Sequence, residues 1–307
     1  MKIMKTAYFA GALAAALVGI HCGSSNNSAS TAGVDENAET ANAAGDTMTS
    51  ADESSQGGGV ALLTPAEEHQ IRARSPMEQV LDSVYGYAYG QSAGCNISIQ
   101  ACLAGVRTGN VNCQINGTSL VASTTLNFGG PDALTCGLET VTDTVHRLAT
   151  ATLTRSNASV SVAPIGDGGQ FLTRTSTGFT LDVLGVERKG TLSDGGPFFD
   201  MTSQTVAGQP LVITHSGMPF HRSNRVMNGT VVIDHKLAKF TTNLTANSVA
   251  WGATCNCATS GNFTATNTNG TAYTLNITGC GTGTLNGTYG DGGVINTSVT
   301  FDRCHGL

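Results

Sequence analysis

The sequence is poor in aromatic residues. They make up 6% of its 307 positions, and Trp251 is the single tryptophan. Exposed aromatic side chains supply much of the flat contact area of many binding sites. Their scarcity argues against a platform of aromatic rings as the functional feature of this chain.

The folded part of the chain also lacks an excess of either charge. From residue 60 onward, 13 lysine and arginine residues stand against 15 aspartate and glutamate residues. A nucleic-acid-binding domain needs a strong basic excess. We therefore expect no nucleic acid partner.

Motifs for metals and cofactors are missing as well. None of the seven histidines falls in an HExxH pattern, and no glycine-rich loop ends in lysine followed by serine or threonine. These patterns hold zinc and phosphate groups in many enzymes. We expect no metal, no cofactor and no enzymatic activity.

No apolar run is long enough to span a membrane. Lys2 and Lys5 precede an uncharged stretch, residues 7–20, that is rich in alanine, leucine, valine and glycine. A spanning helix needs about 20 apolar residues, whereas a shorter run behind positive charges is typical of a signal peptide. The pattern predicts a signal peptide over residues 1–21.

Cys22 lies at the end of this stretch, in the sequence VGIHC, and Gly23 follows it. The arrangement resembles the lipobox of bacterial lipoproteins, although His21 stands where that family usually has a small residue. The resemblance implies that signal peptidase II cuts before Cys22, which then carries the lipid, palmitate included. In the lipoprotein sorting scheme, a residue other than aspartate after the cysteine implies the outer membrane. The alternative is an ordinary secretory signal cut near residues 14–16, with Cys22 as a free thiol.

The cysteine count agrees with a lipidated Cys22. Of nine cysteines, eight remain if Cys22 is acylated, and an even set in an exported chain indicates disulfides. We expect two local sets that do not cross-link. The two sets are Cys95, Cys102, Cys113 and Cys136, and then Cys255, Cys257, Cys280 and Cys304.

Residues 22–59 are predicted to be a disordered acidic tether. After Cys22 they consist of small and polar residues with six acids and no lysine or arginine. Such a segment buries too little apolar area to offset the entropy of ordering it. The tether would hold the folded part away from a membrane surface.

A small helical cap with a cysteine-rich end is predicted over residues 60–110. Thr64, Pro65 and Glu67 form a capping box with proline at the first helical position. A second short helix is possible near residues 97–103.

Residues 111–307 are predicted to form an antiparallel β domain, either a sandwich or a curved, partly open barrel. Threonine, valine, leucine and isoleucine alternate there with period two, which is typical of half-buried strands. Asn-Gly pairs at 116, 228, 269 and 286 and Asp-Gly-Gly triplets at 167, 194 and 291 predict tight turns between strands. The Asn-Gly pair in RVMNGTVVID would thus join two strands.

Two further motifs match known functional patterns, but their sequence context argues against those functions. GQSAG, residues 90–94, matches the nucleophile elbow of esterases, but the alternating strands and helices of that fold are missing around Ser92. A metal site from Cys255, Cys257, Cys280 and His305 is disfavoured, because one residue between paired cysteines is too few for common zinc sites.

The richest polar cluster suggests an anion-binding patch. Its candidate residues are His215, His221, Arg222, Arg225, His235, Lys236 and Lys239. Concentrated positive charge on a near-neutral domain attracts anions such as envelope lipid headgroups or cell-wall polymer. The alternative is a solvated edge hairpin whose charges discourage pairing with other chains.

Together these features predict a lipid-anchored protein of the cell envelope that acts as a non-catalytic binding or adhesion module. A carrier of lipid or another hydrophobic ligand, using a curved sheet, is the alternative. A serine esterase using Ser92 is the third class.

Overall fold

The computed structural model describes residues 44, 47–48, 95–115, 118–137, 140–155, 158–215, 225–252, 255 and 258–301. The predicted signal peptide, Cys22, most of the tether and Ser92 lie outside the described residues. So does the part of the predicted helical cap that precedes residue 95.

The described chain is built almost entirely from β-strands, with a short 3₁₀ helix at Ala133–Thr135 and helical residues at positions 44, 47 and 48. The strands of the N-terminal half are β1 Cys95–Ile99, β2 Val106–Ile115, β3 Thr118–Gly129, β4 Thr144–Arg155, β5 Ala158–Arg174, β6 Gly178–Leu192 and β7 Pro197–Thr205. Those of the C-terminal half are β8 Leu211–His215, β9 Arg225–His235, β10 Phe240–Trp251, β11 Ala258–Asn267, β12 Ala272–Gly279, β13 Thr282–Thr288 and β14 Val294–Thr300.

All of these strands belong to one antiparallel sheet that follows the chain order from β1 to β14. The one departure is at β7 and β8, which share a single place between β6 and β9. β7 pairs with Val186–Thr191 of β6, while β8 pairs with Gly178–Leu181 of the same strand. The mainly β prediction is therefore confirmed, and the sheet is open, with β1 and β14 as its edges.

Alternation of apolar and polar residues gives most of the described strands one buried side. In β10 the residues Phe240, Thr242, Leu244 and Ala246 are buried, and the residues between them are not. A bulge at Ser248, which has φ 50°, shifts the register, after which Val249 and Trp251 are buried. Because side chains alternate across a strand, such a pattern places all buried residues on one face of the sheet.

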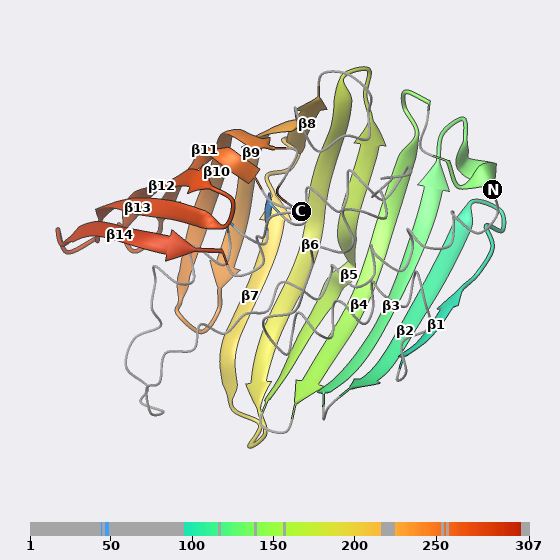
Figure 1. Ribbon diagram of the computed structural model, residues 1–307, viewed down its shortest axis with the longest axis horizontal. Coiled ribbons are helices and arrows are strands. Elements are labelled where there is room, and N and C mark those ends of the chain that lie inside the picture. The colour runs from blue at the N-terminus through green and yellow to red at the C-terminus, as the bar shows by residue number, and fades with distance from the viewer. Residues whose placement is uncertain are drawn as a thin grey trace.

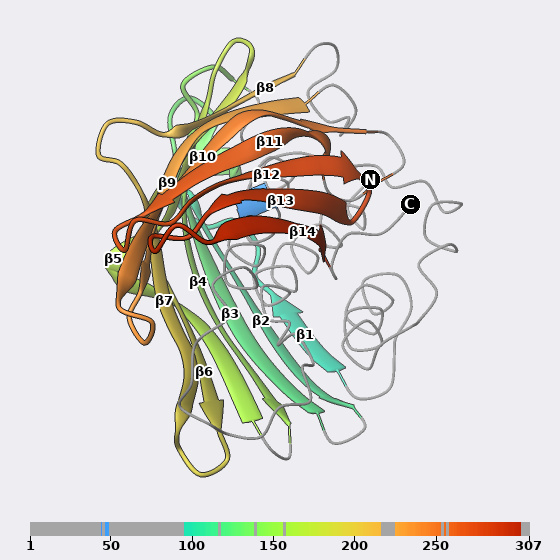
Figure 2. The same cartoon turned by 90° about the vertical axis from the view of Figure 1, so that its left-hand side faces the viewer.

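The sheet curves strongly, and its buried face is the concave one. Figures 1 and 2 show β1–β7 on one side and β9–β14 inclined across them, so that the sheet bends between its two halves. We call the concave, buried side the inner face and the opposite side the outer face. Register irregularities in β4–β5, β5–β6 and β10 coincide with the bending, since bulges kink and twist a strand.

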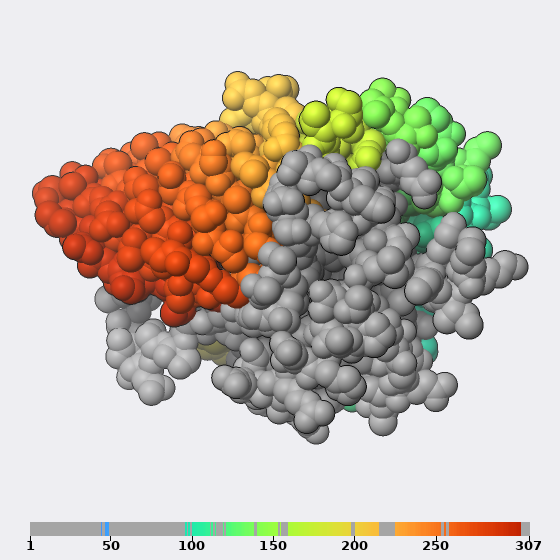
Figure 3. Space-filling model, turned by 45° about the horizontal axis from the view of Figure 1, so that its top comes forward, coloured from blue at the N-terminus to red at the C-terminus, as the bar shows by residue number. Residues whose placement is uncertain are grey.

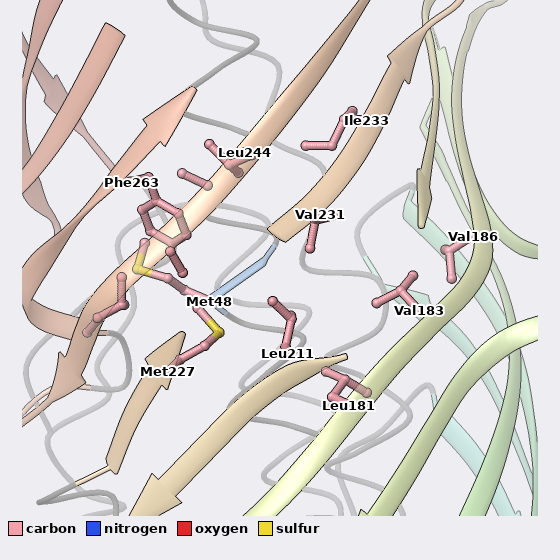
Figure 4. Packing of buried hydrophobic residues seen from close by; sticks show 14 of the residues in the cluster. Met48, Leu181, Val183, Val186, Leu211, Met227, Val231, Ile233, Leu244 and Phe263 are labelled. Carbon is pink, nitrogen blue, oxygen red and sulfur yellow. The ribbon is translucent and has the colours of Figure 1, made fainter. Parts of the chain in front are cut away.

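The hydrophobic core consists of the inner-face side chains of nearly all strands. Its members in the middle of the sheet include Leu181, Leu211, Met227, Ile233 and Phe263, which are almost completely buried. Figure 4 shows how these side chains converge from β6, β8, β9 and β11.

Two residues from the predicted tether, Ala44 and Met48, also belong to this core, and Thr47 beside them is buried. Ala44, Thr47 and Met48 are helical and buried, and Ala44 and Met48 have no exposed surface. Figures 1 and 2 both place this stretch, in blue, inside the curve of the sheet. The prediction of a disordered tether therefore fails at these three positions.

The sheet also begins earlier than the sequence predicted. β1 and β2 start before residue 111, and the possible helix near residues 97–103 is instead β1 and the loop after it. Cys95–Ile99 pairs residue by residue with Gly109–Cys113 of β2. The short apolar alternation in this stretch is that of an edge strand.

The turn predictions hold at some glycines and fail at others. Asn269–Gly270 joins β11 to β12, and the triplets that begin at Asp194 and Asp291 join neighbouring strands, each with the aspartate accepting from the second glycine N–H. Asn228–Gly229 and Asn286–Gly287 lie inside β9 and β13 instead. Asp167 lies within β5 at a register irregularity.

Close packing explains the two Asn-Gly pairs that are not turns. A Cβ on Gly287 would lie 2.7 Å from Tyr273 Cβ, so the absence of a side chain lets Tyr273 pack on the inner face. Gly229 has φ +129°, and a Cβ there would lie 3.0 Å from the Leu211 Cα. These glycines are required by a neighbouring strand rather than by a turn.

Two disulfides are present among the described cysteines. Cys102 is bonded to Cys136, and Cys255 to Cys280. Each bond stays within one predicted local set, which confirms the expectation for these four residues.

We predict that peptide mapping under non-reducing conditions will recover these two bonds together with Cys95–Cys113. Cys95 and Cys113 are opposite each other in the register of β1 and β2, and they are the two members left in the first set. Closing a loop of this size is worth roughly 3 kcal/mol. Recovery of any peptide that joins the first set to the second would contradict the prediction.

Candidate binding surface

The inner face carries buried cations among its apolar side chains. Arg147, Arg188 and Arg225 are all buried, and Arg225 is 1% exposed. Arg147 Nη1 donates to Gln170 Oε1 at 3.4 Å, and Arg188 Nη1 donates to Ser203 Oγ at 3.4 Å. Buried guanidinium groups are tolerated only with such partners, so they tie neighbouring strands together.

A buried hydrogen-bond chain crosses β9, β10 and β11. The Thr242 hydroxyl donates to Asn267 Oδ1 at 2.8 Å and lies 3.2 Å from His235 Nε2. A hydroxyl has one proton, so the Thr242 oxygen must accept from His235, whose Nε2 therefore carries hydrogen. All three side chains are buried, so these hydrogen bonds satisfy polar groups inside the core.

The central part of the outer face carries a cluster of paired charges. Lys236 of the β9–β10 turn pairs with Glu187 of β6 and, at 3.5 Å, with Asp200 of β7. Lys189 lies 3.9 Å from Asp200. The hydrogen bond that Lys236 Nζ donates to Glu187 Oε1 raises the pKa of Lys236, and the charge of Asp200 acts in the same direction.

We call the group of Glu187, Lys189, Asp200 and Lys236 the charged belt. Beyond it, the outer face of β9–β14 is an ordered array of small polar side chains. One row consists of the register partners Thr230, Thr245, Thr264, Thr274, Asn286 and Asn296. A second row consists of Asn247, Asn262, Asn276, Thr284 and Ser298. We call these two rows the threonine–asparagine array; none of its members is buried.

Side-chain hydrogen bonds fix part of this array in place. Thr230 Oγ1 lies 2.9 Å from Thr245 Oγ1 across β9 and β10. Asn247 Nδ2 donates to Asn262 Oδ1 at 3.1 Å and to Thr264 Oγ1 at 3.2 Å. With strands about 4.8 Å apart and alternate residues about 6.7 Å apart, the array is a regular grid of donors and acceptors.

The array has almost no charge around it. Between Phe240 and Phe301 the single charged residue of the sequence is Asp291, which lies in the β13–β14 turn. Figure 3 shows the C-terminal strands, orange to red, as a continuous surface at one end of the molecule. A protein surface normally carries charged side chains, so an uncharged polar grid of this extent is a candidate binding surface.

The predicted anion-binding patch does not form as one exposed surface. Arg225 and His235 are buried on the inner face, so the prediction is wrong for these two residues. Lys236 is paired with acids on the outer face, and Lys239 is exposed in the β9–β10 turn. His221 and Arg222 lie outside the described residues, as does the side chain of His215. β9 lies between other strands and not at an edge of the sheet. This excludes the alternative of a solvated edge hairpin.

Within the described part of the chain, no group of three histidine, cysteine or acidic residues is placed to hold a metal ion. Among the same residues, no helix is long and apolar enough to cross a membrane. No protein family, curated protein or solved structure matches the chain.

The sequence contains the alternation that produces the array, but alternation alone does not predict a binding surface. The alternation that predicts Tyr273, Leu275 and Ile277 on one side of a strand also places Thr274 and Asn276 on the other. What sequence reasoning could not supply was the register that aligns these residues with those of four neighbouring strands.

We predict that Lys236→Gln lowers the free energy of unfolding by less than about 1 kcal/mol at pH 7, because the pair is partly exposed. The pKa of Lys236 is raised above 10.5 in the folded state. Its contribution is therefore complete below pH 10.5 and is lost as pH rises through the folded pKa. Urea unfolding of both proteins should give curves that converge in alkali.

Lys239→Gln is the matched control, since Lys239 is exposed and makes no ion pair among the described residues. It should leave stability unchanged at every pH. A Lys236→Gln deficit that persists undiminished above the folded pKa would contradict the account.

Proposed function

We propose that this protein is a lipid-anchored binding or adhesion module of the cell envelope, and that the threonine–asparagine array binds a neutral, polyhydroxylated polymer. The observation that carries the proposal is the uncharged grid of hydroxyl and amide groups on the outer face of β9–β14. A neutral polysaccharide presents the same chemistry, repeated hydroxyl groups without charge.

The chemical match rests on the type of hydrogen bonds that the array offers. A threonine hydroxyl and an asparagine amide each both donate and accept, so they fit a sugar hydroxyl in either role. Each such bond contributes only about 0.5–1.5 kcal/mol net. Many weak bonds to a repeating polymer nonetheless sum to useful avidity.

Charge argues against an anionic partner at this surface. The array carries no cation, and the nearest charged belt pairs Lys236 and Lys189 with acids. An anionic polymer would gain no Coulomb attraction there. This favours a neutral polymer over the anionic ligands that the sequence suggested.

A carrier function would use the opposite face of the sheet. Inner-face side chains in the middle of the sheet are already buried against other parts of the chain, among them Leu211, Met227 and Phe263. A hydrophobic ligand would have to displace those contacts. The outer face needs no such rearrangement.

The proposed place of action follows from the N-terminal sequence. Cys22 at the end of the apolar run would carry the lipid, and Gly23 after it favours the outer membrane. The disulfides agree with an oxidising compartment such as the periplasm or the cell surface.

We predict that the double variant Thr264→Val, Thr274→Val binds neutral polysaccharide at least about five-fold more weakly than wild type. Valine keeps the side-chain shape and suits an exposed strand, but the two lost hydroxyls remove hydrogen bonds worth about 1 kcal/mol each. Affinity electrophoresis in gels that contain dextran, amylose or soluble cellulose derivatives would measure the change.

The matched control is Thr150→Val, Thr152→Val, which removes two exposed hydroxyls from the outer face of β4. It should bind as wild type does. Wild-type binding to neutral polymers should not change between about 50 mM and 500 mM salt. Dextran sulfate is the anionic comparison that tests the charge argument. Retardation by no neutral polymer, or only by dextran sulfate in a salt-sensitive way, would contradict the proposal.

For the anchor, we predict that Cys22→Ser moves the protein from the membrane fraction to the soluble fraction or leaves the precursor uncut. The serine hydroxyl cannot form the thioether to diacylglycerol. Intact-mass analysis should show loss of the lipid mass. Membrane association and mass that match wild type would refute the assignment.

A further inference from the structure

The C-terminal edge of the sheet has none of the features that normally block pairing with another chain. β14 pairs with β13 along seven consecutive residue pairs, without a bulge or another register irregularity. Its sequence, VINTSVT, contains no proline and no charged residue. Sheet edges usually carry lysine, proline or a bulge, because exposed backbone groups otherwise attract a further strand. β14 is therefore an edge suited to strand addition.

The core ends abruptly at this edge. Among the described residues, no strand lies on the free side of β14. Thr297 faces inward like its register partner Leu285, but Leu285 is completely buried whereas Thr297 is exposed. One more strand beside β14 would cover this part of the inner face.

The hydrogen bonds at the two ends of β14 show which backbone groups point to the free edge. Gly293 O accepts from Tyr289 N–H at 2.7 Å, and Phe301 N–H donates to Gly281 O at 2.9 Å, both on the side of β13. In an antiparallel pair, every second residue bonds to the neighbouring strand and the residues between them bond on the opposite side. The residues whose N–H and C=O groups point to the free edge are therefore Val294, Asn296, Ser298 and Thr300.

These four outward residues are placed symmetrically about Thr297. When two copies of β14 lie antiparallel with their Thr297 residues opposite each other, Asn296 of one copy lies opposite Ser298 of the second. Val294 then lies opposite Thr300, so every outward N–H and C=O group of both strands has a partner. The strand is thus complementary to a second copy of itself.

The side chains match in the same register. On the inner face, Ile295 lies opposite Val299 of the second copy, so apolar side chains meet on each side of the central Thr297 pair. On the outer face, Asn296 meets Ser298. Both belong to the threonine–asparagine array, which would continue from one copy into the other.

No charge opposes this association. Asp291 is the single charged residue between Phe240 and Phe301, and it lies in the β13–β14 turn. In the symmetric pair the two turns lie at opposite ends of the strands, more than about 30 Å apart at about 3.3 Å per residue. Repulsion over that distance is screened, because the Debye length is about 8 Å at physiological ionic strength.

We propose that this protein forms a symmetric dimer in which β14 pairs antiparallel with β14 of a second copy, centred on Thr297. The pair joins two sheets into one, with both inner faces on the same side. The assembly closes at two chains, because each copy uses the same edge. A single strand pair predicts a weak dimer, with a dissociation constant on the order of 10–100 μM.

Dimerisation would double the proposed binding surface, a consequence that rests on the proposed function. The arrays of the two copies would form one continuous grid across the β14 pair. A polymer that contacts both copies would gain affinity, because its second contact is intramolecular.

Sedimentation equilibrium tests the dimer in the full-length chain that carries Cys22→Ser, which removes the proposed lipid site. The weight-average mass should rise from one chain toward two chains between about 1 μM and 500 μM. A mass that stays at one chain throughout would overturn the proposal. A mass that rises past two chains would also overturn it, because head-to-tail pairing of β14 with β1 makes open polymers. The measurement needs neither lipid nor polysaccharide, so its failure is distinct from failure of the proposed function.

The variant Thr297→Lys should raise the dissociation constant at least about ten-fold, because it places two like charges directly opposite each other. The loss should be smaller in 500 mM salt. Thr266→Lys is the matched control, since it adds the same charge at an exposed position of β11 and should dimerise as wild type does. Urea unfolding checks that both variants fold. Dimerisation of folded Thr297→Lys at the wild-type level would place the contact elsewhere and overturn the proposal.

Cysteine cross-linking tests the register. Thr297→Cys puts two thiols on opposite residues, whose Cβ atoms are about 4.5–5.5 Å apart, so mild oxidation should give a covalent dimer on non-reducing gels. Ser298→Cys is the control from the same strand, because its two thiols would lie on diagonal positions about 7–8 Å apart. It should cross-link at least about ten-fold more slowly. Equal or faster cross-linking of Ser298→Cys would overturn the pairing centred on Thr297.

Discussion

Burial of one face of one sheet is the constraint on which the rest of this structure depends. Each fully buried leucine, phenylalanine or methionine contributes about 1.5–3 kcal/mol relative to an exposed one. An antiparallel sheet can supply these residues on one side only, since successive side chains point to opposite faces. The core residues from Ala122 to Phe301 all obey this rule. The sheet must therefore curve around its own apolar side, or other residues must cover that side. The described part of the chain shows both.

The same constraint determines what the outer face can be. Its residues contribute little to the core, so they are free to carry a different chemistry along the sheet. In the middle, Glu187, Asp200 and Lys236 form ion pairs across β6, β7 and β9. The strands β10–β14 contain no charged residue, and the threonine–asparagine array extends across them from β9. One face thus holds the fold together, while the other presents a surface that is regular because the strands are.

The class of fold was predictable because alternation is a local property. Period-two runs, glycine turns and two local disulfide sets are all visible in the sequence, and they agree with the open antiparallel sheet. The errors share one physical cause, which is dependence on a neighbour. Gly229 and Gly287 look like turn glycines but make room for Leu211 and Tyr273 on adjacent strands. Arg225 and His235 look like surface cations but face the core, because register, not composition, decides the face of a strand.

The buried helical residues Ala44, Thr47 and Met48 show the limit of compositional reasoning most clearly. Their surroundings in the sequence are small, polar and acidic, which is why the stretch was expected to be disordered. Ala44 and Met48 are nonetheless completely buried, in the same hydrophobic core as the concave apolar face of the sheet. That face exists only after the whole sheet has assembled, so no local pattern could announce it.

Carbene footprinting of the full-length protein, with and without dextran, tests the central claim that one face makes the core and the other binds. The reagent labels any accessible side chain, and fragment masses assign the labelled positions. The account predicts that dextran lowers labelling at Thr245, Thr264 and Thr274 and leaves the low labelling of Met227 and Leu275 unchanged. A change confined to the inner face, with the array labelled equally in both samples, would contradict it.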